Sequence, residues 1–246
     1  MNSTLKLVFT AAAIVVSSTA CSPVTGAPSS LVSPTAVTLS SVVSPTAVAP
    51  SSAVIPSPEP SSSQHAARLT VAGTDVTGSP LLLTVTLPSD WESFQFGADR
   101  GTSSPPSGMA FIVSTVDNTF KDPCAHVQRS PKIGSTVEAL ATALGEVPNT
   151  TATKPVQTTI AGHQATYIEL AIPASLPCQP SDFYLWQDSP DGNWWVQGLN
   201  ETARVWILEV GGQRVAFLAH SYPGSGANAR AEFEKILNSI VFDVGS

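Results

Sequence analysis

Cysteine and histidine are the residues of this 246-residue chain whose spacing first invites chemistry. Cys124 and His126 stand two positions apart, and a thiol beside an imidazole is a common pair of zinc ligands. A zinc site needs three or four ligands, however, and the other three histidines lie in separate loops or strands. We therefore expect neither a bound metal nor a cofactor.

Cys124 and Cys178 have a simpler interpretation as a structural disulfide. Oxidation is the default for two thiols in an exported domain. The pair encloses 53 residues, from 125 to 177. Closing a loop of that length stabilises a fold by about 4 kcal/mol in the chain-entropy model. The third cysteine, Cys21, is then an odd thiol that needs its own explanation.

The serine, histidine and acidic residues do not form a recognisable catalytic set. Ser225 follows a glycine, but a nucleophile elbow needs glycines where Pro223 and Ala227 stand. His220 is interpreted as a strand-end residue. The acidic segment Asp188–Asn193 lacks the spacing of a calcium loop and is typical of a hairpin turn. We expect no catalytic residues and predict that the protein is not an enzyme.

Tryptophan supplies the candidates for ligand binding, namely Trp186, Trp194 and Trp195. They concentrate, with Phe183 and Tyr184, in one third of the folded part. If the segment is a strand, the adjacent Trp194 and Trp195 point to opposite faces, so at least one is expected to be exposed. Core packing accounts for such residues, and a stacking platform for a sugar or peptide is the functional alternative.

The N-terminus predicts export. Lys6 precedes an apolar run from Leu7 to Val16, and small residues lead to Cys21, which together indicate a signal peptide over residues 1–20. The segment resembles the lipobox of bacterial lipoproteins, with Ser18 where that family favours leucine. The resemblance implies that Cys21 carries an acyl anchor such as palmitate. An ordinary signal-peptidase site and a retained helix are the alternatives, although roughly ten apolar residues are too few to span a bilayer.

Composition then divides the mature chain into two parts. Residues 22–64 of the expected stalk, 21–65, consist almost entirely of Ser, Pro, Thr, Ala and Val, with Glu59 as their only ionisable side chain. Such a segment cannot bury enough surface to offset the entropy of ordering its backbone, so we expect a disordered stalk. Residues 66–246 have the size of a single domain.

The net charge of the chain limits the classes of partner that it is expected to bind. The chain carries a net charge of −7, with acidic and basic residues interspersed and no basic stripe. A protein that binds nucleic acid needs positive charge to offset the phosphates, so we expect no nucleic-acid partner. An acidic surface also suits anionic headgroups poorly, and membrane contact is expected through the lipid anchor alone.

Apolar patterns and turn residues place these candidates on an α+β fold. Ser135 with Glu138 resembles a capping box that opens a helix ending near Gly145. A Gly-Gly pair at 211–212 indicates a tight hairpin. The predicted strands are 81–87, 109–116, 156–160, 165–172, 183–186, 194–197, 204–210, 213–221 and 240–243, and the second helix is 227–239. Because hairpins dominate, the sheet should be largely antiparallel and packed by two main helices.

Several motifs together look like a family of actinobacterial extracytoplasmic lipoproteins and membrane-protein ectodomains. They are a cysteine in Asp-Pro-Cys at 122–124, a cysteine in Leu-Pro-Cys at 176–178, and the ending from 205 to 242. The resemblance covers about residues 81–243, and the family has no agreed activity. The element order is similar to PsbP-like domains, which implies an antiparallel sheet flanked by helices and a non-catalytic accessory or binding role.

The sequence therefore predicts a non-catalytic lipoprotein of the cell envelope, a binding or accessory module at the extracytoplasmic face of the cell membrane. Simple secretion is the alternative location. Cell-wall glycan and another envelope protein are the expected partners besides the membrane itself. An envelope hydrolase that acts on glycan or peptide through a loop-built site is the alternative function, and a passive structural lipoprotein is a third.

Overall fold

The computed structural model describes residues 63–73, 81–101, 103–188 and 192–243. The predicted signal peptide (1–20), the lipidation residue Cys21 and nearly all of the predicted stalk lie outside these residues. Within the described part of the chain, no helix is both long enough and apolar enough to cross a membrane.

An antiparallel sheet of eight strands forms the centre of the domain, in the order β3-β4-β5-β14-β13-β10-β8, with β9 paired to β10. The long hairpin β13–β14 turns at Gly211 and Gly212, whose φ angles of 59° and 79° are the positive values that a two-residue hairpin of the primed type requires. The strands are β3 (Glu92–Phe94), β4 (Gly97–Arg100), β5 (Met109–Thr115), β8 (Thr151–Ala152), β9 (Val156–Ile160), β10 (His163–Ala171), β13 (Thr202–Val210) and β14 (Gln213–Ser221).

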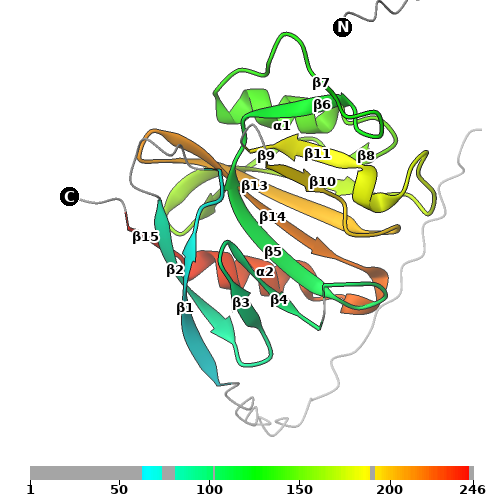
Figure 1. Cartoon of the computed structure of the whole chain (residues 1–246). Helices are drawn as coiled ribbons and strands as arrows, with labels where there is room; N and C mark the ends of the chain where they lie inside the picture. The colour runs from blue at the N-terminus through cyan, green and yellow to red at the C-terminus, as the bar shows by residue number, and fades with distance from the viewer. Residues whose placement is uncertain (1–62, 74–80, 102, 189–191, 244–246) are drawn as a thin grey trace, which may run out of the picture. The chain divides into compact units, whose positions relative to one another are not determined.

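Both faces of the central sheet are covered, as Figure 1 shows. Side chains alternate between faces along a strand, so Val215 and Phe217 of β14 enter one core while Ala216 and Leu218 enter the other. All four are buried. A strand that is buried on both faces reads as a nearly continuous apolar run, which is what β5, β13 and β14 show in the sequence.

The lower layer consists of helix α2 (Ala229–Asn238) and a three-stranded sheet in the order β1-β2-β15. These strands are β1 (Gln64–Thr70), β2 (Leu82–Pro88) and β15 (Val241–Asp243). Trp91 and Trp206 are fully buried beneath this layer. The Trp91 indole nitrogen donates to the Glu232 carboxylate on α2 at 2.7 Å, so the one polar atom of this ring is satisfied.

The upper layer consists of helix α1 (Val137–Gly145) and a four-stranded sheet in the order β12-β11-β6-β7. These strands are β6 (Asn118–Asp122), β7 (Val127–Gln128), β11 (Tyr184–Gln187) and β12 (Asn193–Trp195), and the 3₁₀ turns are η1 (Pro180–Asp182) and η2 (Pro223–Ser225). Leu140 and Leu144 of α1 pack with Ile168 of β10 and Val205 of β13.

The architecture confirms the predicted α+β class, the largely antiparallel sheet and the two main helices. Strands β1, β3, β4, β6, β7 and β8 were not predicted, and two boundaries differ from the prediction. The cap of α1 is Thr136 rather than Ser135, because the helix starts at Val137 and the amide of its third residue, Ala139, donates to the Thr136 hydroxyl at 3.1 Å. Strand β1 begins at Gln64, two residues before the predicted domain boundary of 66.

Candidate functional site

A cleft of about 520 Å³ opens between the upper layer and one end of the central sheet. Its floor is formed by β5 and β14, the two central strands that meet below it. One wall comes from β11 and β12, and the other from the β3–β4 hairpin. The residues that line it are Phe94, Phe96, Ser103, Ala110, Ile112, Tyr184, Gly192, Asn193, Trp194, Trp195, Gln197, Leu218 and His220.

Five aromatic rings make up the walls of this cleft. Phe96 contacts Phe94 and Trp194 edge to face, with ring centroids 5.5 and 5.2 Å apart. Tyr184 lies 6.4 Å from Trp195 on the opposite side. Phe94 and Trp195 are each 37% exposed, whereas Trp194 is half-buried. The cleft therefore presents two aromatic faces to solvent, backed by rings that hold them in place.

Asp188 fixes the orientation of Trp194. The Trp194 indole nitrogen donates to the Asp188 Oδ2 at 2.7 Å. Asp188 is itself buried, and its Oδ1 atom has no hydrogen-bond partner within the described residues. Trp194 is thus held between Asp188 and Phe96, and Trp195 is the more exposed of the two tryptophans in the cleft.

Trp186 was expected among the possible ligand-binding residues, and this prediction is wrong. Its side chain is fully buried in the upper core, where its indole nitrogen donates to the Ser114 hydroxyl of β5 at 3.2 Å. The pairing of β11 with β12 shifts register between Tyr184 and Trp186, so simple alternation fails there, and Trp186 joins the upper core while Tyr184 lines the cleft. Trp194 and Trp195, the other two candidates, both line the cleft.

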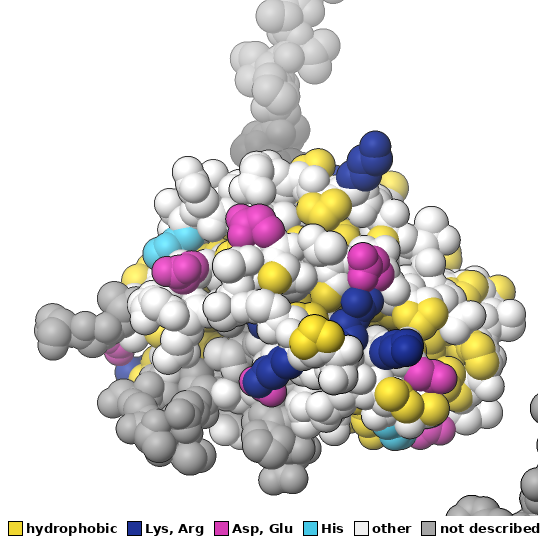
Figure 2. All heavy atoms as spheres, turned by 90° about the horizontal axis from the view of Figure 1, so that it is seen from above, with side chains coloured by type: hydrophobic (Ala, Val, Ile, Leu, Met, Phe, Trp, Pro, Cys, Tyr) yellow, Lys and Arg dark blue, Asp and Glu magenta, His cyan; other side chains and the backbone are white. Residues whose placement is uncertain are grey.

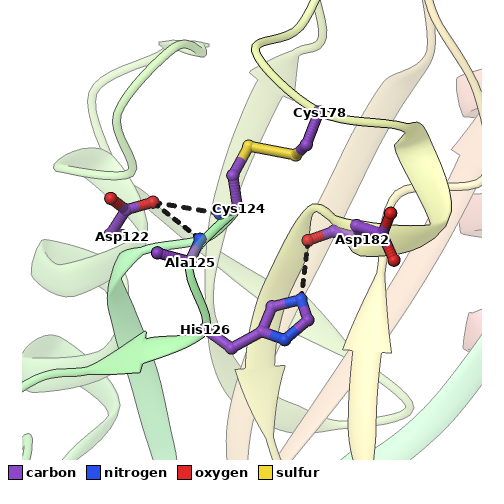
Figure 3. Close-up of a disulfide and its surroundings, with 6 residues drawn as sticks. All are labelled: Asp122, Cys124, Ala125, His126, Cys178 and Asp182. Atoms are coloured by element: carbon purple, nitrogen blue, oxygen red, sulfur yellow. Dashed lines mark hydrogen bonds between the residues drawn. A yellow bond between two sulfur atoms is a disulfide. The ribbon is translucent and has the colours of Figure 1, made fainter.

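Figure 3 shows the disulfide with the residues around it. The Tyr184 amide donates to the carbonyl of Pro123, the residue before Cys124, at 3.4 Å. The structure joins Cys124 to Cys178. The turn that follows Cys124 brings the ring of His126 flat against Tyr184, with centroids 3.9 Å apart. The His126 Nε2–H donates to the main-chain oxygen of Asp182 at 3.0 Å, which ties the two bridged segments together a second time.

This arrangement also accounts for the thiol and imidazole pair that the sequence brings together. Cys124 is bonded to Cys178, and the Asp122 carboxylate accepts hydrogen bonds from the main-chain amides of Cys124 and Ala125 at 3.1 and 3.0 Å. Among the residues that the structure describes, no group of three or more His, Cys, Asp or Glu side chains is placed to hold a metal ion.

His220 is the titratable residue on the floor of the cleft. Burial lowers the pKa of its imidazole to about 4, against a smaller opposite effect from the Ser103 carbonyl. The ring is therefore neutral at neutral pH. Because a carbonyl only accepts, the Nε2 atom donates to Ser103 O at 3.0 Å, which leaves Nδ1 as an acceptor.

The lining of the cleft carries no net charge at neutral pH, since none of its residues is Asp, Glu, Lys or Arg. Elsewhere the surface is charged. Figure 2 shows that Lys and Arg side chains lie among Asp and Glu side chains on the upper face, with hydrophobic side chains between them. The cleft is thus an uncharged concavity in a chain whose net charge is −7.

A buried carboxyl group supports the rim from behind. Glu201 is 1% exposed and accepts the main-chain amides of Gln197 and Gly198 at 2.6 and 3.0 Å. Burial raises the pKa of Glu201 to about 8, although these two hydrogen bonds act in the opposite direction. Glu201 thereby holds the turn that carries Gln197 into the cleft. The sequence shows an acidic residue here but gives no signal of its burial.

Gly198 is needed at this turn because Tyr222 packs against it. A Cβ atom at this position would lie 3.0 Å from the Tyr222 hydroxyl oxygen. That hydroxyl is buried and lacks a hydrogen-bond partner among the described residues. Burial, together with the charge of Glu201, raises the pKa of Tyr222 above its ordinary value.

The remaining candidates for chemistry have structural roles. The Ser225 hydroxyl donates to the Gly108 carbonyl at 2.9 Å and accepts from the Tyr222 amide at 2.9 Å, so it closes the η2 turn. Asp182 is exposed, and its main-chain oxygen rather than its carboxylate makes the contact with His126. The structure does not bring Asp182, Asp188 and Glu201 together in the lining of the cleft.

No protein-family model matches this sequence, and the comparison with curated proteins finds no match. Among solved structures, the chain is similar to LpqN, which is involved in cell envelope biogenesis of Mycobacterium tuberculosis. The identity is 12%, the match covers 72% of this chain and 91% of LpqN, and the TM-score is 0.41. The chain is also similar to the cyanobacterial PsbP (CyanoP) of Synechocystis, with 10% identity, coverage of 73% and 92%, and a TM-score of 0.36. At these scores neither likeness bears on function.

Proposed function

We propose that the protein is a non-catalytic binding module of the cell envelope, whose aromatic cleft holds an uncharged ligand. The observation that carries this proposal is the pair of exposed rings, Phe94 and Trp195, at the mouth of an uncharged concavity. Clefts with broad aromatic surface and a few converging polar groups are the usual form of a small-ligand site.

The composition of the lining favours binding over hydrolysis. Among the residues that the structure describes, its titratable groups are the imidazole of His220 and the phenol of Tyr184, and none of these lining residues carries a carboxylate. A general acid and base must both lie within hydrogen-bond reach of the reacting atoms, and glycosidases use two carboxylates for this purpose. A lining with one neutral imidazole suits a role in orienting a ligand.

We also propose that the protein is held at the extracytoplasmic face by an acyl chain on Cys21, with residues 22–62 as the tether. The lipobox-like sequence before Cys21 and the disulfide of the domain, a bond typical of oxidising compartments, support this location. Mass spectrometry of the mature N-terminus tests it. An unmodified Cys21 there would contradict the anchor and leave the secreted alternative.

The binding proposal is tested with the purified protein and isolated cell-wall material. We expect the wild-type protein to sediment with this material and Trp195→Ala to lose most of that retention, since the exposed indole face supplies contact area. The matched control is Val156→Ala, which removes an exposed apolar side chain, 49% exposed, on β9 outside the cleft. Equal retention of Trp195→Ala and wild type would contradict the proposal. Release of cleaved fragments from the wall material would contradict its non-catalytic part.

A further inference from the structure

We infer that the ligand of the cleft is a neutral saccharide, with one sugar ring stacked on the exposed face of Trp195. The inference rests on the proposed function and assigns a chemical class to the occupant. Three properties of the cleft lead to it, namely which aromatic faces are free, which polar groups surround them, and the absence of charge.

Two of the five aromatic rings of the cleft offer exposed surface on which the apolar face of a sugar ring could pack. Trp195 and Phe94 are each 37% exposed, while Trp194 is held edge-on by Phe96 at 5.2 Å and by its hydrogen bond to Asp188. A pyranose ring has an apolar face of C–H groups that packs on an indole. One side of the ring is thereby desolvated while its rim of hydroxyls stays accessible.

The polar groups around these faces match hydroxyls. Asn193 and Gln197 contribute side-chain amides at the rim. The Gln197 Nε2 donates to the Trp195 carbonyl at 3.2 Å, which leaves Oε1 as an acceptor. His220 offers Nδ1 as a second acceptor from the floor. A sugar hydroxyl both donates and accepts, so it satisfies such groups, whereas an acyl chain would desolvate them without a partner.

The charge of the cleft and of the chain excludes ionic ligands. Among the described residues that line the cleft, there is no Lys or Arg to pair with a phosphate, sulfate or uronic acid, and no Asp or Glu to pair with an amino sugar. The chain's net charge of −7 further disfavours anions. Burying an ion without a counter-charge is costly, so a neutral saccharide is the class that fits.

Calorimetric titration of the purified protein with three neutral trisaccharides, maltotriose, cellotriose and N,N′,N″-triacetylchitotriose, tests the inference. We expect at least one to bind and Trp195→Ala to weaken it by about tenfold, equivalent to roughly 1.4 kcal/mol of stacking. Trp195→Phe should recover part of the affinity, and Val156→Ala should leave it unchanged. Because the ligand is uncharged, raising sodium chloride from 50 to 500 mM should leave the affinity within about twofold. Thermal unfolding of each variant checks that the fold is intact.

Two other uncharged probes separate this inference from the proposed function. Monopalmitoylglycerol represents an acyl ligand, and an acetylated, amidated tripeptide represents an extended peptide. If either probe binds in a Trp195-dependent manner and none of the trisaccharides does, the saccharide inference is overturned and the binding function stands. If no uncharged probe shows Trp195-dependent binding at millimolar concentration, both are overturned. Binding that disappears at 500 mM salt also overturns the inference.

Discussion

Tryptophan side chains have different surroundings on the two sides of the central sheet. On the lower face, Trp91 and Trp206 are completely enclosed by α2 and the three-stranded sheet. On the upper face, exposure rises along the chain from Trp186, which is fully buried, through Trp194, which is half-buried, to Trp195, which is 37% exposed. The layer above the sheet leaves one end uncovered, and the cleft occupies that end.

The layer that covers the sheet, rather than the residue type, therefore decides whether a tryptophan side chain is enclosed in a core or partly exposed. In the lower layer, the indole nitrogen of the buried Trp91 donates a hydrogen bond to Glu232 of α2. The upper layer uses the same kind of hydrogen bond, from Trp194 to Asp188, to hold a ring at the edge of an open cleft. Three predictions test the contrast.

The largest effect is expected in the closed core. Trp206→Ala removes a fully buried indole from β13 and should lower the free energy of unfolding by about 3 to 5 kcal/mol, since lost contacts and a residual cavity both contribute. Urea denaturation followed by circular dichroism measures it. Trp195→Ala is the matched variant at the open end and should cost far less. A similar loss for both variants would mean that the two faces do not differ as described.

A second effect concerns the upper layer. Replacing both Cys124 and Cys178 with alanine should lower the free energy of unfolding by up to about 4 kcal/mol, because the unfolded chain regains the freedom of a long loop. The comparison of denaturation midpoints for the oxidised wild type and the double variant measures it. Adding reductant should bring the wild type toward the variant and leave the variant unchanged. Coincident midpoints would show that the bridge does not constrain the chain.

The smallest effect is a dependence on pH that originates behind the cleft. Burial raises the pKa of Glu201 from 4.5 to about 8, so the native state keeps a proton that the unfolded state releases between these values. This contribution is complete below about pH 4.5 and is lost as pH rises through 8, by up to about 1.4 kcal/mol per pH unit. His220 acts oppositely, because its lowered pKa costs stability as pH falls from 6.5 to about 4. The two offset each other between about pH 4.5 and 6.5, and the Glu201 loss stands alone above that range.

Glu201→Gln isolates this contribution, since the amide oxygen can still accept from Gln197 and Gly198. Melting temperatures measured from pH 6.5 to 8.5 should fall for the wild type and stay level for Glu201→Gln. The control is Glu209→Gln on β13, where the side chain is exposed, and it should follow the wild type. A wild-type curve that is level over this range would show that Glu201 is ionised in the native state.

Local patterns predicted the elements well where the pattern was long or the turn was specific. Nearly continuous apolar runs located β5, β13 and β14, and the Gly-Gly turn located the hairpin of β13 and β14. The strands that escaped prediction are short or poor in β-branched residues, as in the hairpin of β3 and β4. Strand β1 was not predicted, and its first two residues were assigned to the stalk. The reason is that Gln, His and Ala have little preference for strands.

The candidate site could be predicted only in part, for a physical reason. Exposure of one ring of the adjacent pair Trp194 and Trp195 could be predicted, because neighbouring residues of a strand point to opposite faces. Phe94 and Phe96 join them from about a hundred positions earlier in the chain, which only the packing of one layer on another decides. Packing between layers also decides the burial of Trp186, which contacts Ser114 of β5. It decides the burial of Glu201 in the same way.

The bridge between Cys124 and Cys178 couples the maturation of this protein to its proposed activity. The stretch that it clamps presents His126 to the back of Tyr184, and Tyr184 is part of the cleft wall. A newly made molecule whose thiols are still reduced has that wall without its covalent brace. Under the proposed function, the cleft would therefore gain this support only after the two sulfur atoms have been oxidised to the disulfide.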